Sequence, residues 1–226
     1  MLRCRNFIRI YILQLGQFIS QFGNKMTSFA LVMWTYENSG SVISSSALTV
    51  CTLLPSISLS FFAGSFIDGW NKKKVMLISN VIATIFSLIT LVLISLNQLN
   101  ISYLYLINFT LGVVDAFQEP TSNVVISIIV PKEHYTKISG IRSFTTAFST
   151  TFVPIISTGL YALVGLKVII IFDLFSFVFA FISLLFFVSI PNNIIKNQDK
   201  KESFFANCKQ GIDYIIGRKY IFLLNL

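Results

Sequence analysis

Long uncharged segments constrain this chain more than any other feature of its sequence. Residues 42–67 contain no Asp, Glu, Lys or Arg, and neither do residues 75–96. A helix needs about 20 consecutive apolar residues to cross the hydrocarbon core of a bilayer, so each segment is long enough to span a membrane. Between them lies the short charged stretch GSFIDGWNKKK, residues 64–74, as expected for a loop that joins two membrane spans.

The composition argues against a water-soluble domain. Of the 226 residues, 54% are hydrophobic and only 12% are charged. Soluble domains usually carry about 25% charged residues. A globular core of this size could not bury so much apolar surface, because burial is limited by the ratio of surface to volume. We therefore expect an all-α integral membrane protein with lipid as its solvent.

The hydrophobic pattern predicts six membrane-spanning helices. The predicted spans are residues 7–36, 41–67, 75–96, 101–130, 138–164 and 167–190. The connecting segments are short and polar. Pro131 and Pro191 mark helix ends, because proline cannot continue the hydrogen-bond ladder of a helix. Residues 1–190 are thus expected to form a six-helix transmembrane bundle.

The composition changes after the sixth span. We expect residues 191–203 to form a polar linker and residues 204–219 to form an amphipathic helix at the membrane surface. Apolar residues at helical spacing with basic residues between them are typical of such interfacial helices. Residues 220–226 are apolar again and are expected to begin a seventh transmembrane helix.

The positive charges fall on one side of the predicted topology. With a cytoplasmic N-terminus, all but two of the 17 Lys and Arg residues lie in cytoplasmic segments or the helix ends beside them. The exceptions are Lys25, inside the first span, and Lys167, in an outer loop. Cytoplasmic loops of membrane proteins carry an excess of Lys and Arg. We therefore expect the N-terminus and the linker to be cytoplasmic.

Other classes of function find little support in the sequence. The net charge of +8 comes from cations between apolar runs and not from a basic stripe, so we expect no nucleic-acid partner. The three cysteines lack metal-binding spacing, and the single histidine, His134, lies in a polar loop. A GxxxxGK[ST] phosphate loop is absent from the sequence. We expect no enzyme, no cofactor and no metal site.

The loop between the second and third spans carries a family motif. Transporters of the major facilitator superfamily have the pattern G-x-x-x-D-R-x-G-R-K in this loop. The matching positions hold Gly64, Asp68, Lys72 and Lys73. Gly69 replaces the usual Arg, and Asn71 replaces the usual Gly. The resemblance implies a loop that braces the two halves of a transporter in one conformation.

Further stretches narrow the resemblance. GQFIS in the first span, LLPSISLSFFAGSFID in the second, AFQEPTSNVV and IVPKEHYTKISG around the end of the fourth, and FVPIISTGLY in the fifth are similar to the macrolide-efflux branch, the drug:proton antiporter-3 family. The chain resembles the N-terminal half of such a transporter, built from two inverted three-helix repeats. The resemblance implies efflux of macrolides or other lipophilic small molecules across a bacterial cell membrane, with a proton as coupling ion.

The same resemblance implies a missing partner, a C-terminal six-helix half. Two positions also depart from the family pattern. Leu111 stands where the superfamily often has an Arg associated with proton coupling, and the glycine-rich motif of the fifth helix is reduced to Gly159 near Pro154. Two alternatives therefore stay open: an inactive truncated membrane fragment, and a half-transporter that needs a second half or a copy of itself.

Four ionisable residues lie inside predicted spans, where charges are costly and therefore often functional: Lys25, Asp115, Glu119 and Asp173. Asp115 and Glu119 are four residues apart and share one helix face. A rise of about 1.5 Å per residue puts Lys25 and Asp115 at similar depth. We hypothesise that Lys25, Asp115 and Glu119 form a polar cluster in a central cavity and bind a proton or a cationic substrate. Alternatively, Lys25 and Asp115 only neutralise each other, or the sequence is degenerate.

Asp173 lies in the sixth span and is interpreted as a helix-packing acid, with an interfacial position as the alternative. The aromatic-rich sixth helix is expected to face lipid and not substrate. Small residues allow transmembrane helices to approach closely. We expect this role for Gly16, Gly23, Gly64, Gly112, Gly140 and Gly159.

Overall fold

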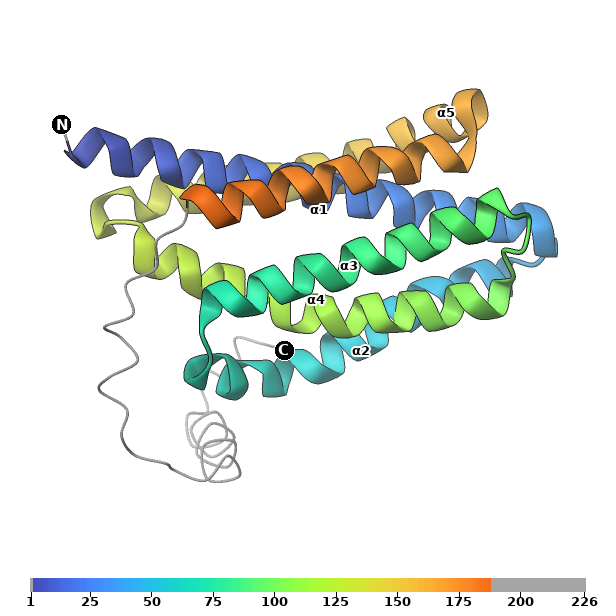
Figure 1. The fold of residues 1–226 in the computed structure, drawn as a ribbon, viewed down its shortest axis with the longest axis horizontal. Helices are drawn as coiled ribbons and strands as arrows, with labels where there is room; N and C mark the ends of the chain where they lie inside the picture. The colour runs from blue at the N-terminus through green and yellow to red at the C-terminus, as the bar shows by residue number, and fades with distance from the viewer. Residues whose placement is uncertain (1, 188–226) are drawn as a thin grey trace.

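Long helices make up the part of the chain that the structure describes. The computed structural model describes residues 2–187. The five helices are α1 (Leu2–Ser39), α2 (Val42–Gly69), α3 (Lys72–Ser95), α4 (Ile101–Ile129) and α5 (Lys132–Phe187). They run side by side (Figure 1). The predicted all-α fold is confirmed, whereas the predicted linker, amphipathic helix and start of a seventh helix lie outside the described residues.

A single turn divides α5 into two antiparallel arms. At Gly165 the backbone is not helical, with φ 78° and ψ 173°. Glycine adopts a positive φ readily because it has no Cβ. The chain reverses there (Figure 1, upper right), so residues 132–164 form a first arm and residues 166–187 a second arm. The two arms of α5 correspond to the predicted fifth and sixth spans, and the described residues therefore contain six helical segments.

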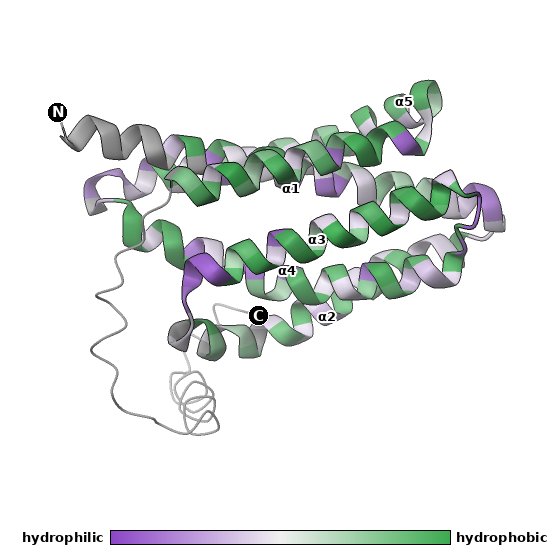
Figure 2. Ribbon diagram, in the orientation of Figure 1, coloured by the Kyte–Doolittle hydropathy of each residue, from purple (hydrophilic) through white to green (hydrophobic). Residues whose placement is uncertain are grey.

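Among the described helices, α2, α3 and α5 are long and apolar enough to cross a membrane by length and composition. The apolar region of α5, Glu133–Phe186, includes both arms. Helices α1 and α4 have 38 and 29 residues and carry charged side chains within their length, Lys25 in α1 and Asp115 and Glu119 in α4. Hydrophilic residues gather at both ends of the bundle, with mostly hydrophobic ribbon between them (Figure 2).

The turns alternate between the two ends of the bundle. The start of α1, the turn between α2 and α3, and the turn between α4 and α5 lie at one end (Figure 1, left). The turns that follow α1 and α3 lie at the opposite end, together with Gly165. Lys72, Lys73 and Lys74 therefore lie at the same end as the start of α1.

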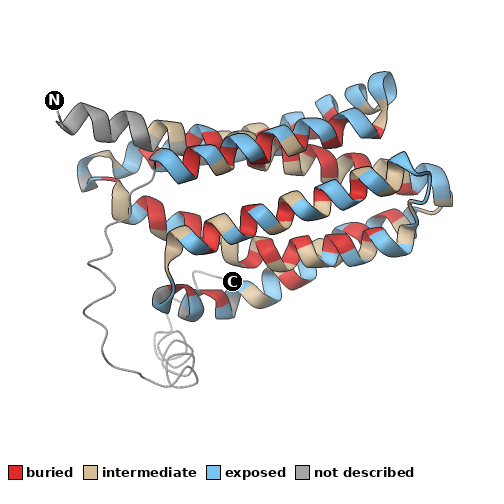
Figure 3. Ribbon diagram, in the orientation of Figure 1, coloured by how far each residue is buried: buried red, intermediate tan, exposed pale blue. Residues whose placement is uncertain are grey.

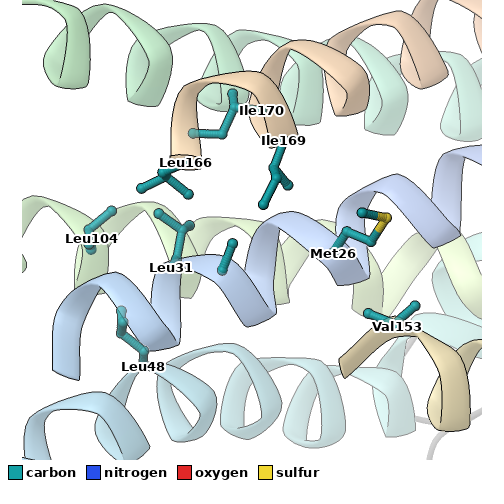
Figure 4. Close-up of a cluster of buried hydrophobic side chains, with 9 residues drawn as sticks. Met26, Leu31, Leu48, Leu104, Val153, Leu166, Ile169 and Ile170 are labelled. Atoms are coloured by element: carbon teal, nitrogen blue, oxygen red, sulfur yellow. The ribbon is translucent and has the colours of Figure 1, made fainter. Parts of the chain in front are cut away.

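Helix α1 packs mainly against α5, and α2 packs mainly against α4, while α3 contacts both α4 and α5. The largest buried apolar cluster joins α1, α2, α4 and α5. Its labelled members are Met26, Leu31, Leu48, Leu104, Val153, Leu166, Ile169 and Ile170 (Figure 4). Buried residues lie between the helices, and exposed residues cover their outer faces (Figure 3).

Glycines and serines bring α1 close to the second arm of α5. A Cβ at Gly16 would lie 2.9 Å from Ser183 Oγ, and one at Gly23 would lie 2.6 Å from Ser176 Oγ. Ser183 Oγ also donates a hydrogen bond to the carbonyl oxygen of Ile12 at 3.2 Å. Small residues allow the close approach, and the hydroxyl then finds a backbone partner in the absence of water.

Other hydroxyl groups bind backbone carbonyls across further helix pairs. Ser157 Oγ, in the first arm of α5, donates to the Met26 carbonyl oxygen at 2.9 Å. Tyr105 OH, in α4, donates to the Ser44 carbonyl oxygen at 3.1 Å. Such bonds tie α1 to α5 and α2 to α4 where these helices already pack closely.

Gly112 marks the closest crossing of α4 with α2. A Cβ there would collide with the carbonyl oxygen of Thr52. The predicted close approach is thus confirmed at Gly16, Gly23 and Gly112. At the other three of the six predicted glycines, Gly64, Gly140 and Gly159, the prediction is wrong for the described part of the chain, because a Cβ there would meet nothing within 4 Å.

The substitution Gly112→Ala should destabilise the bundle by about 1–3 kcal/mol, because the new methyl group forces α4 away from α2. The matched control is Gly159→Ala, which places a methyl group in open space within a helix. Removing a helical glycine stabilises by about 0.5–1 kcal/mol, so the control should be neutral or more stable. Thermal unfolding of both purified variants measures the difference, and equal stability would contradict the α2–α4 crossing.

Candidate functional site

A cavity of about 300 Å³ lies between α1, α2, α4 and the first arm of α5. Pockets for small molecules usually have volumes of about 300–1,000 Å³. Neither α3 nor the second arm of α5 lines the cavity. Its polar lining residues are Lys25, Ser28, Thr49, Thr52, Asn108, Ser149 and Thr150.

The cavity wall combines fixed polar groups with apolar surface. Thr52 Oγ1 donates to Asn108 Oδ1 at 3.2 Å and so joins α2 to α4. The Asn108 amide in turn donates to the Leu104 carbonyl oxygen at 2.9 Å. Phe29 and Leu48 add apolar wall on either side. Such a lining suits a mostly apolar ligand with a few hydrogen-bonding groups.

Lys25 is the one charged residue that lines this cavity, and it is half-buried. It attracts the Asp115 carboxylate of α4 electrostatically, and Glu119 repels that carboxylate. Asp115 is half-buried and Glu119 is exposed. Asp115 follows Asn108 by two helical turns, about 10 Å along α4. The structure therefore places Lys25 and Glu119 where their charges act on Asp115, but only Lys25 reaches the cavity lining.

An aromatic cluster beside Lys25 was not predicted from the sequence. Its rings come from α1 and the first arm of α5, and its paired ring centroids lie 4.5 to 6.4 Å apart. Its members are Phe18, Phe22, Phe144, Phe148 and Phe152, which we call the phenylalanine cluster. Phe144 and Phe152 are 69% and 43% exposed, so the cluster presents an open aromatic surface.

The phenylalanine cluster adjoins the cavity. Phe18, Phe22, Lys25 and Phe29 follow one stripe of α1, because residues three or four apart share a helix face. Lys25 and Phe29 line the cavity. The spacing of four between phenylalanines in both helices is the sequence signal that could have revealed the cluster, but their pairing depends on how α1 packs against α5.

Asp173 lies outside the cavity and is fully buried, with 0% exposure. Ser87 Oγ of α3 donates to Asp173 Oδ2 at 3.1 Å. A Cβ at Gly23 of α1 would lie 2.9 Å from Asp173 Oδ1. The acid thus lies where α1, α3 and the second arm of α5 meet, which favours the packing interpretation over an interfacial position.

The family motif loop is anchored within its own six-helix half. The Asn71 side chain caps α3 by accepting hydrogen bonds from the backbone N–H groups of Lys73 and Lys74, at 3.1 and 3.2 Å. Lys73 Nζ donates to the carbonyl oxygen of Leu185 at 3.0 Å. This contact ties the start of α3 to the last described turn of α5.

The remaining motif residues occupy the same end of the bundle. Gly64 is exposed near the end of α2, and Lys72 is the first residue of α3. Asp68 belongs to the last turn of α2, and its side chain lies outside what the structure describes. The predicted functional residues therefore fall into two regions: the cavity around Lys25, and the turn between α2 and α3 at one end of the bundle.

Comparison with known proteins identifies the family. The family model "Major Facilitator Superfamily" matches residues 13–225, and the chain therefore belongs to this superfamily. Macrolide efflux protein A of Streptococcus pyogenes is 25% identical over 220 residues, which cover 97% of this chain and 54% of that protein. Macrolide efflux protein A of Enterococcus faecalis is 28% identical over 164 residues, covering 72% and 50%.

A third relative, the uncharacterized MFS-type transporter YkuC of Bacillus subtilis, is 27% identical over 175 residues, covering 77% of this chain and 40% of that protein. The chain spans about half the length of the curated relatives it matches. No solved structure matches it. The predicted resemblance to the macrolide-efflux branch of the superfamily is confirmed.

Removing either Lys25 or Asp115 should destabilise the bundle, because each charge is then left without its attractive neighbour. Lys25→Met, Asp115→Asn and the double variant form a cycle, measured by thermal unfolding of the purified protein. We expect a favourable coupling of about 0.5 kcal/mol, at the lower end of the range for residues that belong to one charged network. Lys167→Met is the control cation and should show no coupling to Asp115→Asn. A coupling of zero for Lys25 would contradict the electrostatic pair.

Proposed function

We propose that this chain forms the N-terminal half of a secondary transporter that exports macrolide-like or other lipophilic small molecules. The observation that carries the proposal is the cavity between α1, α2, α4 and the first arm of α5, with Lys25 and the phenylalanine cluster beside it. The similarity to macrolide efflux proteins supports the same substrate class.

The proposed mechanism is alternating access around a site near the membrane midplane. Transporters of this architecture bind substrate between two halves that rock against each other. In our proposal this chain supplies one wall of the site, and a second six-helix half supplies the other. The phenylalanine cluster would take the apolar surface of the substrate, while Lys25 and the hydroxyl groups of the cavity would bind its oxygen atoms.

We also propose that Asp115 and Glu119 carry the coupling proton. Leu111, at the position of the arginine usually associated with coupling, is buried against Ala83, Ile107 and Phe177. That position therefore points into the core and away from the cavity. Among the described residues, Lys25 is the cation whose charge acts on Asp115. In our proposal it takes over the role of that arginine.

The proposed orientation has the N-terminus in the cytoplasm of a bacterial cell. The lysines that begin α3 lie at the same end of the bundle as the start of α1, and basic residues mark the cytoplasmic side of membrane proteins. In our proposal, export requires a second six-helix half beside this one. An inactive fragment is the alternative that the experiment must exclude.

Macrolide-sensitive bacteria that express this chain together with the C-terminal half of a macrolide efflux protein should accumulate less labelled macrolide than cells that express neither. Efflux by the pair, but not by the chain alone, is the expected result, because half of the cavity wall is otherwise missing. If cells that express the pair accumulate as much of every tested macrolide as cells that express neither half, the proposed transport is contradicted.

The substitution Phe148→Ala should weaken binding of a labelled macrolide to the purified chain roughly tenfold, because an aromatic contact contributes about 0.5–1.5 kcal/mol beyond its buried area. Phe175→Ala is the matched control, since Phe175 is 71% exposed on the second arm of α5, outside the cavity. Equilibrium binding in lipid nanodiscs measures both. Equal losses in the two variants would contradict a ligand role for the cluster.

Asp115→Asn and Glu119→Gln should each abolish the dependence of efflux on the proton gradient in the paired transporter, because an amide cannot carry the proton. Glu133→Gln is the control acid, exposed at the start of α5 and distant from the cavity. Drug efflux at several external pH values provides the measurement. Efflux at the level of the unmodified protein in both variants would exclude the proposed coupling role.

A further inference from the structure

Asp173 is a buried carboxylate in a setting of hydroxyl groups. Three of them lie around it: Ser87 on α3, Thr27 on α1 and Ser176 on its own helix. All four residues are at most 5% exposed. Among the described residues, the interactions of this carboxylate are with hydroxyls and include no cation. A carboxylate buried without a positive partner costs several kcal/mol, so such a group is either protonated or compensated by a bound cation.

The Thr27 hydroxyl is the second observation. Thr27 is 5% exposed, and its side chain lies beside the Asp173 carboxylate. Its Oγ1 atom nevertheless forms no hydrogen bond with any residue of the described part of the chain. Buried polar groups without a protein partner are rare and call for a bound water or ion as explanation. The unpaired oxygen of Thr27 and the buried carboxyl group of Asp173 therefore point to the same location.

The oxygen spacing at Asp173 is wider than that of strong hydrogen bonds. Hydroxyl-to-carboxylate bonds are usually about 2.5–2.7 Å long. Here Ser87 Oγ lies 3.1 Å from Oδ2, and Ser176 Oγ lies 3.5 Å from Oδ1. Oxygen ligands about 2.4 Å from a cation and at right angles to each other are about 3.4 Å apart. Ser176 Oγ also donates to the Asp173 carbonyl oxygen at 2.7 Å, which fixes its position.

We propose that Asp173, Ser87, Thr27 and Ser176 form a binding site for a sodium ion. All the ligand atoms are oxygens, which favour hard cations. One carboxylate neutralises a single positive charge, so a monovalent ion leaves no net charge in the bilayer, whereas a divalent ion would. The ligands come from α1, α3 and the second arm of α5, so the ion joins three spans outside the substrate cavity. The site does not depend on the proposed substrate.

Sodium should stabilise the purified chain of 226 residues specifically. We expect its melting temperature in detergent to be about 3 °C or more higher in sodium chloride than in potassium or choline chloride of equal ionic strength, since a ligand that binds only the folded state stabilises it. Asp173→Asn should abolish the difference between sodium and potassium. Thr27→Val and Ser87→Ala should each reduce it.

Ser183→Ala is the matched control, because it removes a buried hydroxyl from the same helix contact without touching Asp173. It should retain the full sodium effect even if it lowers stability overall. Equal melting temperatures of the unmodified chain in sodium and potassium would overturn the proposal, as would a stability that follows pH alone. If Asp173→Asn does not fold, an unchanged sodium effect in Thr27→Val and Ser87→Ala would overturn it equally.

Discussion

The hydrocarbon core of a bilayer offers no hydrogen-bonding partners, so polar groups packed between the helices of this bundle depend on partners within the protein. Helices satisfy their own backbone, and most remaining polar side chains turn to a neighbouring backbone. Ser183 and Ser157 bind carbonyl oxygens of α1, and Tyr105 binds one of α2. The hydrophobic effect does not drive helix association in lipid, so close packing and these bonds hold the helices together.

The same constraint separates the bundle into two sides. Helix α3 and the second arm of α5 support the others and contribute nothing to the cavity lining, whereas α1, α2, α4 and the first arm expose polar groups to it. Polar atoms on the cavity side have water or a ligand as partners. Polar atoms on the supporting side, such as Asp173, are sealed between helices and depend on whatever the packing encloses.

The six spans could be predicted from the sequence because bilayer thickness sets their length, and the reversal at Gly165 followed from a short polar break between apolar runs. The proximity of Lys25 to Asp115 followed from counting helical rise. The phenylalanine cluster and the hydroxyls around Asp173 depend on helix rotation and on neighbours distant in the chain, which periodicity does not define. Gly64, Gly140 and Gly159 show that a small residue alone does not identify a helix contact.

The partnership of α1 with α5 has a consequence for biogenesis. The backbone groups of α1 that accept hydrogen bonds at Met26 and Ile12 receive them from residues 131 and 171 positions later in the chain. The first helix therefore enters the membrane long before its partners are synthesised. Until the second arm of α5 is inserted, the side chains of Gln14 and Gln17 on α1, which are buried in the finished bundle, must face lipid or proteins of the insertion machinery. The packing of α1 is therefore completed late, after nearly the whole six-helix half has been synthesised.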